Sequence, residues 1–286
     1  MRKYTLLFTL SLIWGSQFLF IALITHDASS ITISFYKALL ATLFLFIMTL
    51  FMRKTPYKKQ WGLYILIAIF EVVIPFIFIV QGQRYISSGM ASIIIALTPV
   101  FTLFILILIL IRQRKFNLVE IFALILGIFG IVILSWNPEK LGLVEYVSLG
   151  LLLIASLSFA ISLVLMQNLQ DDVPIHHMRN VLSIATIILI PITIFSSNTF
   201  TLHFDPLQWS SLIILGLVHS ALAYVIYNIL VRQYDAVFAS LSNYIVPVVG
   251  VLLGVLILHE HLTLNIIIGS AVVLLSLIIS QQVKSG

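Results

Sequence analysis

The stretch "WGLYILIAIFEVVIPFIFIVQG" (residues 61–82) decides the fold class, because only one charged side chain, Glu71, interrupts its apolar run. About 20 mainly apolar residues are enough for a helix to cross a lipid bilayer. The whole chain has the same character, since 61% of its 286 residues are hydrophobic and 9% are charged. A soluble domain has about 25% charged residues, so this chain could not cover a water-facing surface. The composition therefore indicates an integral membrane protein.

Apolar segments long enough to cross a bilayer recur along the entire chain, separated by short connections. The predicted segments are 4–25, 32–52, 62–82, 88–111, 117–136, 145–167, 177–196, 208–231, 236–258 and 263–282. The first begins like a signal peptide, but its apolar stretch is longer and no A-x-A cleavage site follows, so we expect it to be retained. The sequence thus predicts an all-α integral membrane protein with ten transmembrane helices.

The distribution of basic residues predicts how the chain is oriented. If the N-terminus is cytoplasmic, only Arg84 and Lys140 lie in outer connections, Lys37 lies within a span, and every other lysine and arginine lies inside. Membrane proteins carry such an excess of Lys and Arg on the cytoplasmic side. We therefore expect a multi-pass protein of the cell (cytoplasmic) membrane with both termini cytoplasmic. The formal charge of +5 then reflects basic loops at the membrane surface, not nucleic-acid binding.

An internal repeat divides the chain into two units, residues 1–137 and 138–286. One ungapped shift of 148 residues superimposes a set of landmarks: Trp61 on Trp209, Arg84 on Arg232, Ala91 and Ser92 on Ala239 and Ser240, Pro99 on Pro247, and Asn117 on Asn265. Each unit contains five predicted helices, an odd number, so the second unit must cross the membrane in the opposite direction. The prediction is two inverted five-helix repeats, which can rock about a central site.

Three stretches resemble a known family. These are "LSLIWGSQF" (10–18), "ASIIIALTPVFTLF" (91–104) and "ASLSNYIVPVVGVLLGVLILHEHLTLNIIIGSAVVLLS" (239–276). They are similar to the drug/metabolite transporter (DMT) superfamily, in particular its ten-helix EamA-type branch, which typically has residues equivalent to Pro247, Gly250, Gly254, Glu260 and Gly269. The chain departs from the pattern at Arg112, where relatives often have a glutamate, and at Lys37, near a frequent arginine. The resemblance implies transport of a small metabolite.

Glu71 and His219 are the leading candidates for a substrate or proton site. A charged group at the centre of a membrane costs about 2.5–3.5 kcal/mol on insertion scales, and such groups usually face a bundle interior or a watery cavity. The 148-residue shift places His219 at the equivalent depth. We expect Glu71 to exchange a proton or to contact a cationic substrate group, with His219 as its partner. The alternative is a protonated glutamate that only packs against a neighbouring helix.

Other polar, aromatic or helix-breaking residues within the spans are candidates for lining the cavity. They are Trp14, Gln17, Lys37, Ser92, Pro99, Tyr224, Tyr227, Asn228, Ser240, Asn243 and Pro247. Lys37 can extend to the membrane interface, or it can contact a substrate carboxylate or Glu71. The "GVLLG" pair at 250–254 favours helix packing. We expect Glu260 to cap the following helix or to pair with a neighbour, and His176 and His177 to lie in a solvated turn.

The function that these residues favour is secondary transport of a small organic metabolite by alternating access. An amino acid or related compound, exported from the cytoplasm, is the leading candidate, and proton coupling is one option. No G-x-x-x-x-G-K-[ST] motif occurs, so the chain does not hydrolyse ATP itself. The chain has no cysteine, and we expect no metal, no cofactor and no nucleic-acid partner; the protein would act as a monomer or homodimer in the bilayer. The alternatives are efflux of lipophilic cations, an enzyme acting on lipid-linked substrates and a structural subunit.

Overall fold

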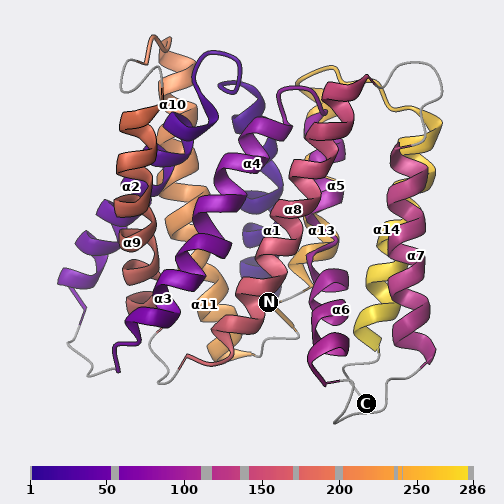
Figure 1. Cartoon of the computed structure of the whole chain (residues 1–286), viewed down its shortest axis with the longest axis horizontal. Coiled ribbons are helices and arrows are strands. Elements are labelled where there is room, and N and C mark those ends of the chain that lie inside the picture. Colours follow the sequence, from indigo (N-terminus) through magenta and orange to yellow (C-terminus); the bar gives the residue numbers. More distant parts are fainter. Residues whose placement is uncertain are drawn as a thin grey trace.

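The computed structural model describes residues 2–52, 58–110, 118–135, 142–169, 174–196, 202–234, 238–239 and 241–282. Within these ranges the chain forms long helices joined by turns, and no strand occurs among them (Figure 1). The helices are α1 (Arg2–Ala22), α2 (Ser30–Leu50), α3 (Trp61–Ile67), η1 (Ala68–Val73), α4 (Ile74–Gly82), α5 (Ser88–Ile95), α6 (Thr98–Leu110), α7 (Leu118–Ser135), α8 (Leu143–Met166), α9 (Pro174–Phe195), α10 (Pro206–Ile214), η2 (Leu215–Leu222), α11 (Ala223–Gln233), α13 (Ser242–Leu256) and α14 (Leu264–Gln282).

Seven of the helical segments are long and apolar enough to cross a membrane. They are Arg2–Ala22, Ser30–Leu50, Trp61–Gly82, Ser88–Ile109, Leu143–Met166, Ile175–Phe195 and Pro206–Tyr227. Three shorter apolar helices, Ile121–Leu134, Ser242–Leu256 and Leu264–Ile279, fall on the remaining predicted segments. The all-helical, multi-pass architecture is therefore confirmed, while the count of ten crossings and the inverted repeat stay predictions.

Two of the long segments contain a π-helical stretch near their middle. The segment from α3 to α4 contains η1, and the segment from α10 to α11 contains η2. A π-helix inserts extra backbone into a turn, and such stretches are frequent at functional sites. Because η1 carries Glu71 and η2 carries His219, the two candidate site residues lie in the two segments of irregular backbone.

Pro99 explains the interruption between α5 and α6. A proline has no N–H, so the carbonyl of the residue four positions earlier, Ile95, loses its helical donor. The hydroxyl groups of Thr98 and Ser156 donate to this carbonyl at 2.8 Å and 3.3 Å. Helix α8 thus supplies part of the replacement through Ser156.

The helices pack in pairs that join distant parts of the sequence. Helix α7 packs on α14, α2 on α9, and α5 on α13, while α1 contacts α13 and α11, and α8 contacts α4 and α6. The α7–α14 pair forms one edge of the bundle in Figure 1. In the same view the connections 23–29, 83–87 and 257–263 lie at the upper end, which we call the upper face, and α8 ends at the opposite, lower face.

Glycines allow the closest of these approaches. A Cβ atom at Gly15 in α1 would lie 2.5 Å from the Cβ of Val249 in α13, and one at Gly250 would overlap with the side chain of Ser92 in α5. The expectation that Gly250 serves helix packing is therefore confirmed. Ser92 donates to the carbonyl of Gly89 within α5 at 2.6 Å, and its hydroxyl lies 3.4 Å from the carbonyl oxygen of Pro247 in α13, so it takes part in the same contact.

Replacing Gly250 with alanine is expected to lower the free energy of unfolding by about 1–3 kcal/mol, the usual cost of overpacking a tight contact. The matched control is Gly150→Ala in α8, where a new Cβ meets nothing within 4 Å. Alanine is about 1 kcal/mol more favourable than glycine inside a helix, so the control should be neutral or slightly stabilising. Unfolding of both variants in the same detergent measures the difference, and equal stabilities would contradict a tight α5–α13 contact.

Candidate substrate cavity

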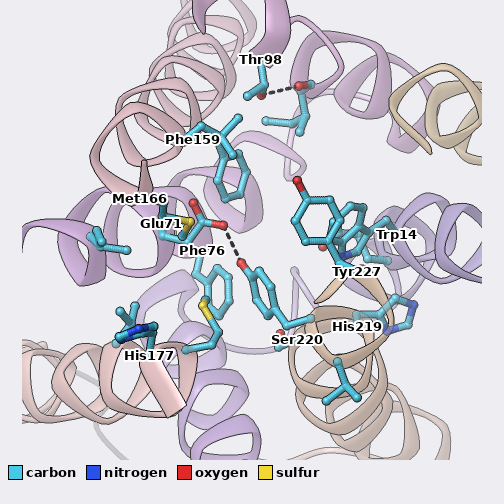
Figure 2. Close-up of a pocket in the computed structure, with 18 of the residues that line it drawn as sticks. Trp14, Glu71, Phe76, Thr98, Phe159, Met166, His177, His219, Ser220 and Tyr227 are labelled. Carbon is cyan, nitrogen blue, oxygen red and sulfur yellow. Dashed lines mark hydrogen bonds between the residues drawn. The ribbon is translucent and has the colours of Figure 1, made fainter. Parts of the chain in front are cut away.

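A cavity of about 260 Å³ lies inside the bundle and is lined by residues from both halves of the chain. Aromatic rings make up much of its wall, namely Trp14, Phe76, Phe159, Tyr224 and Tyr227. In Figure 2, Glu71 and Phe76 project from one side, while Trp14, Tyr227 and His219 project from the other. Binding pockets for small molecules are mostly apolar with a few placed polar groups, and this cavity has that composition.

Glu71 reaches the cavity from the π-helix η1. Its side chain is buried, and its Oε1 atom accepts a hydrogen bond of 2.6 Å from the hydroxyl of Tyr224, shown by a dashed line in Figure 2. Its Oε2 atom is buried and has no hydrogen-bond partner among the described residues. An unpaired buried polar atom is costly, so this oxygen is available to a proton or to a bound molecule.

His219 lies in η2 and also lines the cavity, but it is held separately from Glu71. Its Nδ1 atom lies 3.1 Å from the carbonyl oxygen of Ile214, and its Nε2 atom lies 3.0 Å from the hydroxyl of Ser16. Since a carbonyl can only accept, Nδ1 donates and Nε2 accepts from Ser16. The expected direct partnership between Glu71 and His219 is absent from the described contacts, because Tyr224 occupies that role.

Of the two alternatives for Lys37, the structure places the residue in the cavity wall and not at the membrane interface. Its side chain is only 3% exposed and lines the cavity. Its Nζ atom lies 3.9 Å from the centroid of the Phe76 ring, the geometry of a cation–π contact. A glycine explains why the backbone is so close to the bundle interior: a Cβ at Gly216 in η2 would lie 3.3 Å from the carbonyl oxygen of Lys37.

The other predicted cavity residues divide into three groups. Trp14, Gln17, Tyr224, Tyr227 and Asn243 line the cavity. Ser92, Pro99 and Pro247 are not part of its lining; Ser92 is used in helix packing, and Pro247 lines a separate apolar groove between α13 and α14. Ser240 and the side chain of Asn228 lie outside the described residues.

Sequence reasoning missed His177. We expected His176 and His177 to lie in a solvated turn, and this is wrong, because both are buried in the first turn of α9. The Nδ1 atom of His177 lies 2.6 Å from the hydroxyl of Tyr64, and the residue lines the cavity. The signal was Pro174, since proline is common at the first position of a helix; the two histidines therefore belong to the helix.

Among the described residues, the lining of the cavity extends toward the lower face and not toward the upper face. Met166, Leu169 and Ile175, at the end of α8 and the start of α9, belong to its lining, whereas no lining residue comes from the connections 23–29, 83–87 or 257–263. At the upper face the amide of Gln208 donates to Asp27 Oδ2 at 2.6 Å, which joins the two halves.

Glu260 makes the second contact between the halves at the upper face. Of the two alternatives for this residue, it pairs with a neighbouring helix instead of capping the following one. Its carboxylate accepts from the backbone N–H groups of Ser88 at 2.6 Å and Gly89 at 3.1 Å, at the start of α5. A carboxylate is favourable there, because the first N–H groups of a helix have no intrahelical partner and carry partial positive charge.

Replacing Tyr224 with phenylalanine is expected to destabilise the protein by about 1–3 kcal/mol, because it leaves a buried carboxylate oxygen without its donor. The matched control is Tyr227→Phe, which removes a hydroxyl of the same cavity for which the described residues offer no hydrogen-bond partner. In a Glu71→Gln background the cost of Tyr224→Phe should shrink, and the double-mutant cycle gives the coupling energy. Equal losses for both tyrosines would show that the Glu71–Tyr224 bond contributes nothing.

Comparison with known proteins gives consistent results. The profile of the EamA-like transporter family matches residues 1–136 and 147–281. An "Uncharacterized transporter" of Archaeoglobus fulgidus is 27% identical over 98% of both chains. "Uncharacterized transporter YoaV" of Bacillus subtilis is 25% identical over 93% of this chain and 91% of its own. A "Biotin transporter" of Salmonella typhimurium is 26% identical over 77% of this chain and 73% of its own.

A solved structure has the same fold. It superimposes with a TM-score of 0.67, covers 99% of this chain and 97% of its own, and is 12% identical in sequence, so the likeness concerns the fold alone. The family profile spans nearly the whole chain, and the curated relatives are named as transporters. The chain therefore belongs to the EamA-like transporter family.

Proposed function

We propose that this membrane transporter is a secondary transporter that moves a small organic metabolite across the cytoplasmic membrane by alternating access. The observation that carries the proposal is a cavity, lined by both halves, that contains a buried carboxyl group and whose described lining extends toward one face of the bundle. Membership of a transporter family supports transport over the enzymatic alternative. An amino acid or a related compound, exported from the cytoplasm, remains the leading candidate for the cargo.

The helix contacts support an inverted repeat of residues 1–137 and 138–286. If the two halves are exchanged, the α1–α13 pair corresponds to α8–α6, the α4–α8 pair to α11–α1, and the α2–η2 pair to α9–η1, and all of these pairs are in contact. The pairs α2–α9 and α7–α14 correspond to themselves. A shift of η1 by 148 residues falls within η2. These relations fit ten crossings in two units of opposite direction.

The distribution of contacts supports alternating access. With the termini in the cytoplasm, the lower face is cytoplasmic, so this conformation faces inward. The upper, outer face is closed by Glu260 on the α5 N-terminus and by the Gln208–Asp27 bond. Both contacts join one half of the chain to the other, so rocking of the halves breaks them together and opens the cavity outward.

Glu71 is the proposed proton carrier. Its Oε1 atom is fixed by Tyr224, and its Oε2 atom has no partner among the described residues. Intramembrane carboxyl groups in such positions mark proton relays in transporters. His219 is committed to Ser16 and Ile214, so in this proposal it shapes the cavity wall and Glu71 alone carries the proton.

Purified protein in liposomes with an imposed pH gradient is expected to accumulate at least one member of a panel of labelled amino acids and related metabolites. Biotin belongs in the panel because of the Salmonella relative. Glu71→Gln should abolish the dependence on the gradient, because an amide cannot exchange the proton. The control Glu145→Gln changes a carboxyl group that does not line the cavity and should behave as wild type. Unchanged rate and pH dependence in Glu71→Gln would remove the proton role.

The closed outer face is testable with a single reporter, because the chain has no cysteine. Gln17→Cys places a thiol in the cavity wall, and a membrane-impermeant maleimide should label it slowly from outside intact cells. Adding Glu260→Gln weakens a charge-assisted contact worth about 1.5–3 kcal/mol, so outside labelling should rise by about tenfold or more. Glu145→Gln is the control. Two results would contradict a closed outer face. One is outside labelling that Glu260→Gln leaves unchanged. The other is labelling of the Gln17→Cys protein that is faster in intact cells than in inside-out vesicles.

A further inference from the structure

We infer that the cavity binds a monocarboxylate and that Lys37 is the residue that recognises its carboxylate group. The inference rests on the proposed transport function and concerns the same cavity. Its starting observation is an ammonium group in the cavity wall, carried by a side chain that is only 3% exposed.

Lys37 has no anionic partner among the described residues. No described carboxylate forms an ion pair with Lys37. Its Nζ atom lies instead over the Phe76 ring, 3.9 Å from the ring centroid. Glu71, the acidic residue in the cavity lining, uses its Oε1 atom to accept from Tyr224. Charged groups away from water are normally paired, and a bound anion would supply the counter-ion that the described residues do not offer.

The position of Lys37 is fixed by close packing of α2 on η2. A Cβ at Gly216 would lie 2.5 Å from the Cβ of Leu40 and 3.3 Å from the carbonyl oxygen of Lys37. Further along α2, the hydroxyl of Thr42 lies 3.0 Å from the hydroxyl of Thr186 in α9, which joins these two helices. The ammonium is therefore presented to the cavity by a helix that is held on two sides.

The charge balance of the cavity favours a monoanion. A lysine binds carboxylate and phosphate alike as a point charge. A phosphate monoester carries about −1.5 to −2 charges at pH 7 and would require more than one cation. Among the described lining residues, Lys37 is the single lysine, and no arginine occurs there. The carboxyl group of Glu71 lies in the same cavity. A single carboxylate matches one ammonium, whereas a lipophilic cation would be repelled by it.

The walls indicate what the carboxylate is attached to. Trp14 and Tyr227 form an aromatic pair with ring centroids 5.4 Å apart, and Phe159 lies on the cavity wall as well. Flat apolar groups pack well on such rings. The ligand class is therefore a carboxylic acid with an apolar or aromatic body, a class that includes apolar amino acids.

Benzoate and benzamide, which share shape and differ in charge, test the inference on the purified full-length transporter. Ligands that bind the native state raise its thermal midpoint. Benzoate should raise the midpoint of the wild type and bind at least about tenfold more tightly than benzamide, as judged by titration of the midpoint or of tryptophan fluorescence. Lys37→Met should reduce benzoate to the level of benzamide, while Lys37→Arg, which keeps the charge, should retain the preference.

Lys59→Met is the matched control, because Lys59 is an exposed lysine whose Nζ also lies over an aromatic ring, 5.9 Å from the centroid of Trp61. It should bind benzoate as the wild type does. The inference is overturned if benzoate and benzamide are equivalent in the wild type, if neither raises the midpoint, if the preference survives in Lys37→Met, or if tetraphenylphosphonium binds more tightly than benzoate.

Transport measured separately in liposomes distinguishes this inference from the proposed function. A benzoate preference that depends on Lys37, in a protein that transports no member of the metabolite panel, would leave the carboxylate site standing and reject the transport proposal. Transport of a panel member without any preference for benzoate would do the reverse.

Discussion

The structure depends on one constraint: polar groups within the spans must find partners inside the protein, because hydrocarbon offers none. The chain meets it mainly with hydroxyl groups that bond to backbone carbonyls. Thr25, in the connection after α1, donates to the carbonyl of Val80 in α4 at 2.7 Å, and Ser276 in α14 donates to that of Ala123 in α7 at 2.7 Å. The carbonyl freed by Pro99 is satisfied in the same way. Because so many polar groups are consumed in packing, the few left in the cavity stand out as candidates for function.

The same packing explains why the space that remains is central. Glycines bring α1, α5 and α13 into close contact, and another brings η2 against α2, so the seams between the halves are tight at these points. The π-helices η1 and η2 depart from regular α geometry at the level of the cavity, which changes the direction of the side chains that follow. A carboxyl group and an imidazole can thus point inward from segments whose flanking helices face lipid, as the exposed Ile65, Leu66 and Ile213 show.

Much of the fold could be predicted from the sequence, because length and hydropathy alone define a membrane helix. The composition, the apolar segments and the family motifs all depend on local residue type, and they indicated the correct fold class. The cavity was harder. Glu71, Lys37 and His219 were identifiable as polar residues in apolar runs, but their partners were not, since Tyr224 is 153 positions from Glu71 and Ser16 is 203 positions from His219.

The errors share a physical origin. Contact of Lys37 with the membrane interface stayed open as an alternative because one turn of helix separates it from the predicted end of its span, yet depth in the membrane says nothing about which side of the helix faces the bundle. His177 was placed in a loop because histidines follow the charged "DD" pair, although Pro174 begins a helix there. Ser92 and Pro247 resembled cavity residues by spacing, but a small residue opposite Gly250 is needed for packing. Spacing along a helix identifies a face, and only tertiary contact decides what that face meets.

In the proposed function, the lack of a described ion pair between Lys37 and Glu71 gives the cavity its capacity for binding. Two opposite charges in direct contact would satisfy each other, and a ligand would have to separate them before it could bind either. Here the carboxyl group is held by a neutral phenol and the ammonium by an aromatic face. Both partners stabilise without neutralising, so each charged group keeps part of its capacity for an incoming molecule or proton. A transporter needs charged groups that are only partly stabilised by protein partners, because a site that binds too tightly cannot release its cargo on the other side.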